Sequence, residues 1–153
     1  MEKLELKIPP IIQVIVIGIL MIVSSAYLPA IGVSIWARTY LALVVFIVGM
    51  YFSLAGVFEF RRKRTTVDPR YPGNVSALVD SGIYQISRNP MYVGFALFLF
   101  SIVIFFCSPL LLLGVFAFVL FMNRFQISPE EAYLSNAFGE EYESYKQKVR
   151  RWV

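Results

Sequence analysis

Long hydrophobic runs alternate with polar segments along this chain of 153 residues. The first uncharged run has 18 residues and would extend roughly 27 Å as a helix, close to the hydrocarbon thickness of a bilayer. The last two runs are separated only by Cys107, Ser108 and Pro109, which predicts a helical hairpin with a tight turn. The pattern therefore predicts an all-α integral membrane protein with about four transmembrane helices, at residues 11–28, 39–60, 91–106 and 110–125.

The first run has a second interpretation, as a cleavable signal peptide, because Lys3 and Lys7 precede it. The run is long for a signal peptide, and no convincing small-x-small cleavage site closes it. We therefore interpret it as the first span. The whole chain, residues 1–153, is expected to form a single membrane domain.

Two polar segments, residues 61–90 and 126–153, flank the hairpin in sequence, and the hairpin should bring them together in space. The first segment is rich in turn formers, and so long a loop is uncommon unless it is functional or disordered. We expect the two segments to form one site.

The second segment opens with Ser128, Pro129, Glu130 and Glu131, which predicts a helix with Ser128 as its N-cap. Further along, apolar residues recur every three or four positions, as on one face of an interfacial helix. Gly139 lies within this stripe and predicts a kink or a break. The stripe consists of Leu134, Phe138, Tyr142, Tyr145 and Val149.

Composition supports the membrane interpretation and narrows the chemistry. The chain is 58% hydrophobic and 16% charged, which excludes an ordinary soluble globule. The absence of histidine excludes an imidazole base and histidine metal ligands, and the one cysteine excludes an internal disulfide and a cysteine-rich zinc site. No glycine-rich nucleotide motif can be drawn, and neither a metal nor a nucleic acid is expected as a partner.

Basic residues predict the orientation, because positively charged short loops stay in the cytoplasm. In the four-span arrangement 13 of the 14 lysines and arginines fall on one side, and only Arg38 falls on the other. All ten acidic residues share the first side. Both termini and nearly all polar chemistry are therefore predicted to be cytoplasmic.

The start of the third run could bind an anion. Asn89 and Pro90 are typical of an N-cap and a first helical position, and free amides there, with Arg88, would cradle a carboxylate. Tyr84 and Tyr92 could stack on a base. The plainer interpretation is a capped helix with Arg88 and Tyr92 anchored at the interface.

The same contrast applies to the second segment. Glu130 and Glu131 need no role beyond a favourable interaction with a helix dipole. Arg124, however, lies at the end of a predicted span, where an ionisable residue is costly and favours a site or a specific partner.

The stretch LVDSGIYQISRNPMYVG, followed after one hairpin by EEAYLSNAFGEEYESYKQKVRRW, resembles the isoprenylcysteine carboxyl methyltransferase family. The resemblance covers residues 76–152 and rests on a GxYxxxRxPxYxG pattern with EExxL and FGEEYxxY in order. It implies a membrane enzyme that binds S-adenosylmethionine between the loop, the hairpin and the C-terminal helix, with a lipophilic acceptor entering from the bilayer. The implied cofactor residues are Ser76, Ala77, Leu78, Val79, Tyr84, Arg88, Asn89, Pro90, Met91, Tyr92, Glu130 and Glu131.

Two positions depart from the family pattern. Asn89 replaces a histidine that many members carry, although RNPxY also occurs among prokaryotic members. Gln126 stands where the family often has an arginine associated with the acceptor, and a glutamine does not pair bidentately with a carboxylate. An amine, thiol or phospholipid headgroup is therefore as plausible an acceptor as a carboxylate.

Arg124 and Gln126 are the residues expected to face the acceptor. They lie two positions apart, about 200° around an ideal helix, so both can face one pocket only if the helix unwinds before Pro129. We expect a bend at residues 125–128, with Arg124 paired to Glu130 or Glu131.

Two other functions remain as alternatives. Membrane sterol reductases have a similar architecture and bind a nicotinamide dinucleotide, although four spans leave little volume for it. A non-enzymatic scaffold that docks partners or anionic lipids through its basic clusters would have no saturable cofactor site.

Overall fold

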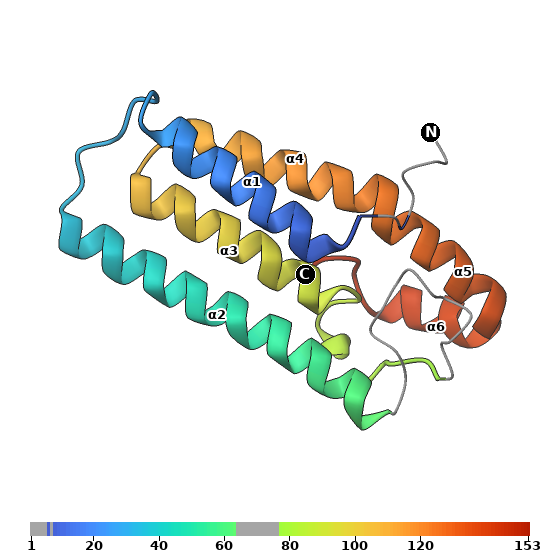
Figure 1. Cartoon of the computed structure of the whole chain (residues 1–153). Coiled ribbons are helices and arrows are strands. Elements are labelled where there is room, and N and C mark those ends of the chain that lie inside the picture. Colours follow the sequence, from blue (N-terminus) through green and yellow to red (C-terminus); the bar gives the residue numbers. More distant parts are fainter. Residues whose placement is uncertain (1–5, 7, 64–76) are drawn as a thin grey trace.

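The structure is a computed structural model that describes residue 6 and residues 8–63 and 77–153, and every regular element in these residues is a helix (Figure 1). Helix α3 lies at the centre of the bundle and packs against α1, α2 and α4. Helices α5 and α6 extend the bundle at one end (Figure 1). The α-helices are α1 (Pro10–Ser25), α2 (Ile35–Arg62), α3 (Pro90–Phe106), α4 (Leu112–Phe121), α5 (Ser128–Phe138) and α6 (Glu140–Lys148), and the short elements are η3 (Gly82–Gln85), η4 (Pro109–Leu111) and the π-helix η5 (Met122–Ile127).

The four predicted hydrophobic runs are all helical, but they differ in length from the prediction. Within the described residues, two helices are long and apolar enough to cross a membrane, namely α2 with 28 residues and the continuous helix Pro109–Phe138 with 30. Helices α1 and α3 are apolar but shorter, with 16 and 17 residues. The four-span topology and its orientation therefore remain predictions.

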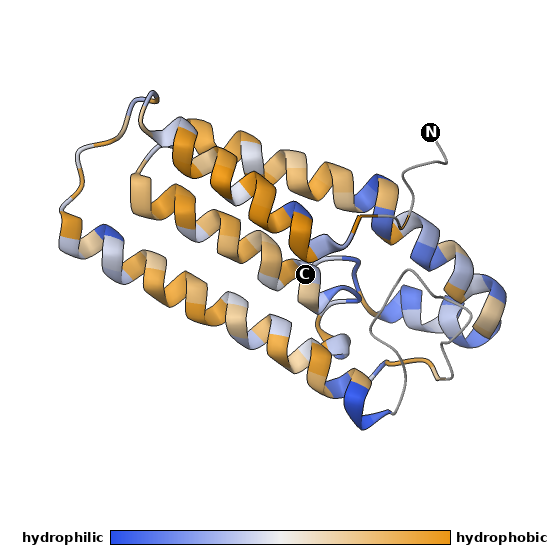
Figure 2. Cartoon of the chain, in the orientation of Figure 1, coloured by the Kyte–Doolittle hydropathy of each residue, from blue (hydrophilic) through white to orange (hydrophobic). Residues whose placement is uncertain are grey.

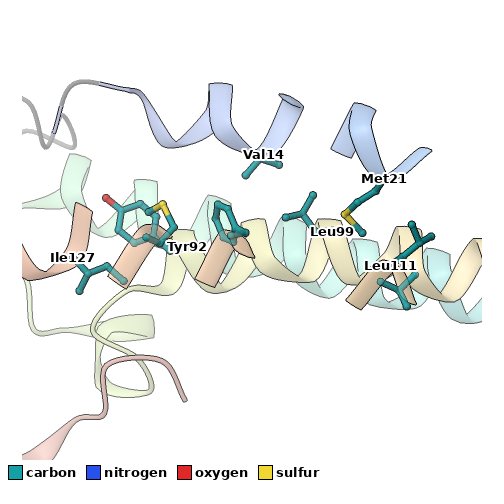
Figure 3. Packing of buried hydrophobic residues seen from close by; sticks show 9 residues of the cluster. Val14, Met21, Tyr92, Leu99, Leu111 and Ile127 are labelled. Carbon is teal, nitrogen blue, oxygen red and sulfur yellow. The ribbon is translucent and has the colours of Figure 1, made fainter. Parts of the chain in front are cut away.

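The outer faces of the bundle are apolar, as a lipid environment requires (Figure 2). Large hydrophobic side chains such as Leu20, Leu54 and Leu120 are about 60% exposed, at 59%, 61% and 68%. Between α1, α3 and α4 lies a core that contains Val14, Leu99 and other side chains (Figure 3).

Small residues let α2 and α3 approach closely. A Cβ atom on Gly94 would lie 2.1 Å from Ser53 Oγ and 2.5 Å from the Gly49 carbonyl oxygen. One on Gly56 would lie 2.6 Å from Met91 Cγ at the first turn of α3. This contact is typical of helices that associate in membranes through glycine and other small residues.

Helix α5 begins at Ser128, as predicted, but Ser128 is not an N-cap, and residues 125–128 are helical where a bend was predicted. The chain continues from α4 through the π-helix into α5, and Ser128 has helical φ and ψ of −61° and −44°. Pro129 lacks an N–H for the Phe125 carbonyl, which instead accepts a hydrogen bond from the Leu6 N–H at 3.1 Å. The Ser128 hydroxyl donates to the Asn123 carbonyl at 2.7 Å. Side-chain and tertiary partners thus satisfy carbonyls that regular α-helical bonding would leave open around the proline.

The predicted break at Gly139 is confirmed. Gly139 has φ +51° and separates α5 from α6. The predicted apolar stripe is also confirmed, because its members pack together with the chain around residues 78–84.

Candidate functional site

The described part of the first polar segment and the second polar segment lie against each other, as predicted. We call their shared hydrophobic contact the tyrosine cluster. The Tyr145 hydroxyl crosses it and donates to the Tyr84 carbonyl at 2.6 Å. The tyrosine cluster consists of Leu78, Val79, Ile83, Tyr84, Tyr142, Tyr145 and Val149.

Tyr84 is only 5% exposed and packs edge-on against Phe60, with ring centroids 5.5 Å apart. Burial raises the pKa of its hydroxyl well above 10.0, and the nearby Tyr145, Glu130 and Glu59 raise it further. Tyr84 therefore stays protonated, and stacking of a base on its ring would require neighbours to move.

A buried polar cluster connects α3 to the long helix. The Tyr92 hydroxyl donates to Glu130 Oε1 at 2.8 Å, and the Gln126 amide donates to the same oxygen. Tyr92 is 6% exposed and Gln126 is 2% exposed. Among the described residues, both hydrogen-bond partners of this carboxylate are neutral. A carboxylate held in this way is a candidate to face a positive charge.

The helix dipole does not explain Glu130 and Glu131, because α5 continues the helix from α4 and η5 and has no free N-terminus at Ser128. Glu131 has two cationic partners instead. It accepts from Arg88 Nη2 at 2.8 Å and from Arg151 Nε at 3.1 Å. These pairs connect the start of α3, α5 and the C-terminal end of the chain.

Arg88 does not form the open anion cradle that the sequence suggested. Its guanidinium is paired with Glu131 and also donates to the Lys146 carbonyl at 3.3 Å. Its Nε is buried and has no hydrogen-bond partner in the part of the chain that the structure describes. One buried donor of Arg88 thus has no acceptor among the described residues.

Asn89 occupies the predicted N-cap position of α3 but makes no side-chain cap hydrogen bond. Its side-chain amide instead donates to the Arg151 carbonyl at 2.9 Å, and the Arg88 N–H donates to the Arg150 carbonyl at 3.0 Å. Trp152 donates to Asn123 Oδ1 at 3.0 Å. The chain end after α6 is therefore fixed across the first turn of α3, which lies beside the C label in Figure 1.

The structure separates the two residues expected to face the acceptor. Gln126 points inward to Glu130, whereas Arg124 is exposed and its guanidinium carbon lies 5.6 Å from the Phe125 ring centre. The described bonds of Glu130 and Glu131 are made to other residues than Arg124.

The remaining predicted residues lie near the cluster. Leu78 and Val79 belong to the tyrosine cluster, and Ala77 precedes them with intermediate exposure. Pro90 is fully buried and Met91 packs against Gly56. Ser76 lies outside the described residues.

Sequence reasoning missed Glu59, Tyr145, Arg151 and Trp152. For Glu59 there was a signal, since it is the one acidic residue within the predicted span 39–60. Tyr145 was expected on the apolar stripe, but nothing in the sequence indicated its bond to Tyr84, 61 residues away. Arg151 and Trp152 had no signal, because their partners lie 20 and 29 residues away along the chain. The described residues hold no group of three or more Cys, Asp or Glu side chains that could bind a metal.

Several known proteins are similar to this chain over part of its length. A probable protein-S-isoprenylcysteine O-methyltransferase from Oryza sativa subsp. indica is 33% identical over 117 residues, which are 74% of this chain and 60% of that protein. The protein-S-isoprenylcysteine O-methyltransferase of Schizosaccharomyces pombe is 42% identical over 79 residues, 47% of this chain and 30% of that protein. An uncharacterized protein from Haemophilus influenzae is 48% identical over 63 residues, 41% of this chain and 100% of that protein.

The chain thus spans less than two thirds of the length of the two named methyltransferases, 60% of one and 30% of the other. No solved structure matches it. The sequence profile of the phospholipid methyltransferase family matches residues 37–141, from α2 to the start of α6. This match confirms the resemblance drawn from the two sequence motifs, and the chain belongs to the phospholipid methyltransferase family.

Proposed function

We propose that this protein transfers a methyl group from S-adenosylmethionine to a lipophilic acceptor at the boundary between membrane and cytoplasm. The observation that carries the proposal is the buried Glu130 carboxylate, held by Tyr92 and Gln126 where the two sequence motifs meet. The family membership and the names of the relatives support the reaction class.

The residues present fit such a methyl donor in two respects. Glu130 offers a buried carboxyl group, which would complement a sulfonium cation in its ionised form. Arg88 Nε is a buried donor without a partner among the described residues, and it suits a carboxylate. The donor would be held by residues 77–79, Tyr84 and residues 88–92 on one side, and by Glu130 and Glu131 on the other.

When bound, S-adenosylmethionine supplies an electrophilic methyl group that an acceptor atom takes in line as the thioether leaves. The chain itself has to position two ligands and complement charge, and this needs neither histidine nor a metal. Tyr92 and Gln126 would fix the Glu130 carboxylate. The exposed apolar faces of the helices would let an acceptor approach from the bilayer.

The acceptor follows in part from the charges at the cluster. A buried carboxylate beside Gln126 disfavours a second carboxylate by like-charge repulsion. We therefore propose an amine, thiol or phospholipid headgroup as the acceptor before a prenylcysteine carboxylate. We further propose that the full chain is one membrane domain with four spans and cytoplasmic ends, since 13 of its 14 basic residues fall on one side.

Binding measured on the protein in lipid nanodiscs tests the proposal. We expect saturable binding of adenosylhomocysteine and none of a reduced nicotinamide dinucleotide phosphate. Glu130→Gln removes the charge and should weaken binding of S-adenosylmethionine, which carries the sulfonium, more than binding of adenosylhomocysteine, which does not. Glu143→Gln, on the exposed face of α6, should change neither. Binding of the dinucleotide alone would indicate a reductase, and binding of neither compound would indicate a scaffold.

Turnover then identifies the acceptor. The protein is incubated with S-adenosylmethionine that carries a labelled methyl group. The acceptor offered is either a phospholipid with an amine headgroup or a prenylcysteine with a free carboxylate. Labelling of the prenylcysteine alone would overturn the proposed preference while leaving the methyltransferase function intact.

A further inference from the structure

Helix α2 carries a buried acid that the proposed chemistry does not use. Glu59 lies near the end of this 28-residue apolar helix, and its side chain is only 9% exposed. Among the described residues, the cation paired with it is Arg62, at 3.8 Å and with a side chain 68% exposed. Such an exposed partner contributes little, so the burial of this carboxylate has another cause.

That cause is the turn before α3. The Ser81 hydroxyl donates to Glu59 Oε2 at 2.8 Å across 22 residues of sequence. Gly82 has φ +57°, and a Cβ atom there would lie 2.5 Å from Glu59 Oε1. The carboxylate is therefore packed directly against the turn and bonded to it, and only glycine fits at residue 82.

The face of α2 that holds this acid also contacts α3. Its buried residues Ala42, Gly49 and Gly56 recur every seven positions, and Glu59 follows one turn later. Gly56 touches the first turn of α3 through Met91. One helix face thus contacts both α3 and the turn that precedes it.

The turn at Ser81 and Gly82 also positions residues of the candidate site. Ser81 and Gly82 open η3, and the next two residues, Ile83 and Tyr84, are buried in the tyrosine cluster. Tyr84 lies near Glu59 of α2 and near Glu130 of α5. A shift of this turn would move Tyr84 and the chain leading to Arg88 and Asn89.

We infer that Glu59 is a positioning residue: its contacts with Ser81 and Gly82 fix the η3 turn, so that Tyr84 and the start of α3 face the α5 carboxylates. The expected effect of Glu59 on ligand binding rests on the proposed function. Its expected effect on the η3 turn does not.

Four variants in nanodiscs test the inference. Glu59→Ala removes the acceptor, Ser81→Ala removes the donor, and Glu59→Gln keeps an acceptor oxygen for Ser81. The matched control is Asp80→Asn, next to Ser81, because Asp80 is exposed and pairs with Lys63 at 3.5 Å. We expect the two alanine variants to weaken adenosylhomocysteine binding by about tenfold, the scale of one hydrogen bond to a charged group. Glu59→Gln should retain most of the affinity, and Asp80→Asn all of it.

The double variant Glu59→Ala with Ser81→Ala should bind adenosylhomocysteine as well as the weaker-binding single variant does. The reason is that both substitutions remove the same hydrogen bond. Turnover should show a raised KM for the methyl donor with kcat at saturation largely retained. A general loss of stability would not give this division between KM and kcat. If Glu59→Ala does not fold, Ser81→Ala alone decides, because it removes only a hydroxyl group.

Hydrogen exchange of the segment 82–87 supplies a readout that needs no ligand. Faster exchange there in both alanine variants, with the control unchanged, supports the inference. Unchanged exchange together with unchanged affinity overturns it and leaves the proposed function standing. A wild-type protein that binds no adenosylhomocysteine refutes the proposed function, and the exchange measurement still decides whether Glu59 fixes the turn.

Discussion

Tyr92 on α3 donates a 2.8 Å hydrogen bond to Glu130 on α5, 38 residues further along the chain. Tyr92 follows the RNP motif, and Glu130 begins the EExxL motif. The two motifs are therefore joined by a direct bond as well as lying close together.

Tyr92→Phe removes this bond and nothing else from the ring. We expect a loss of roughly 1.5–3 kcal/mol in the interaction with the carboxylate and a lower affinity for adenosylhomocysteine. Tyr40→Phe is the control, because Tyr40 is 68% exposed. Thermal unfolding and ligand titration in nanodiscs measure both effects, and equal affinities for the two variants would mean that the Tyr92 hydroxyl has no part in the site.

Glu131→Gln should release the C-terminal end of the chain. It removes the charge that holds both Arg88 and Arg151. We expect faster tryptic cleavage after Arg150 and Arg151, because the chain end there loses its ionic partner. Glu143→Gln, a glutamate on α6 with a side chain 51% exposed, should leave the cleavage rate unchanged. Equal cleavage rates in both variants would show that backbone hydrogen bonds alone fix the chain end.

Gly94→Ala should disrupt the contact between α2 and α3. Its Cβ atom would lie 2.5 Å from the Gly49 carbonyl oxygen, which belongs to the backbone and cannot move alone. We expect a destabilisation of about 1–3 kcal/mol. Gly32→Ala is the control, since a Cβ atom at Gly32 would have no neighbour within 4 Å. Unfolding midpoints in the same detergent compare the two, and an unchanged midpoint for Gly94→Ala would contradict the tight packing.

Alkaline pH should undock α6. Burial is the main cause that raises the pKa of Tyr145 above 10.0 in the folded protein. A raised folded pKa favours folding below the unfolded pKa, and this contribution is lost as the pH rises above 10. The near-UV dichroism of the tyrosines should therefore change above that pH.

Tyr145→Phe should show a smaller alkaline change, because the phenylalanine has no hydroxyl that must ionise inside the contact with the Tyr84 region. It should also be less stable at neutral pH, since the Tyr84 carbonyl loses its donor. Tyr27→Phe, at a position 85% exposed, should behave as wild type. An identical alkaline transition in all three proteins would show that Tyr145 does not control the docking of α6.

Sequence reasoning succeeded where the signal was local. The pair Asn89 and Pro90 marked the start of α3, and Gly139 marked the break between α5 and α6. Both signals depend on backbone preferences of the residues themselves. The period of the apolar stripe likewise identified the face of α6 that is buried.

It failed where the outcome depended on distant partners. Ser128 and Pro129 look the same at a free helix start and directly after a π-helical turn. The Leu6 N–H that accommodates the proline comes from the other end of the chain. Arg88 looked free because Glu131, which pairs with it, lies 43 residues away. A local pattern gives residue types but cannot say which of them will be paired.

Because residues 122–127 form a π-helical turn, the length of this segment matters for the position of Glu130 as much as the identity of its residues does. Each residue of an α-helix turns the chain by about 100°. Deleting one residue from this turn would restore the regular α-helical phase and rotate everything after it, Glu130 included, away from Tyr92. Every side chain of the polar cluster would still be present, and the cluster would be lost. A related sequence that lacks one residue between the hairpin and the EExxL motif is therefore expected to have a differently arranged site. Such a deletion would indicate this more clearly than most substitutions would.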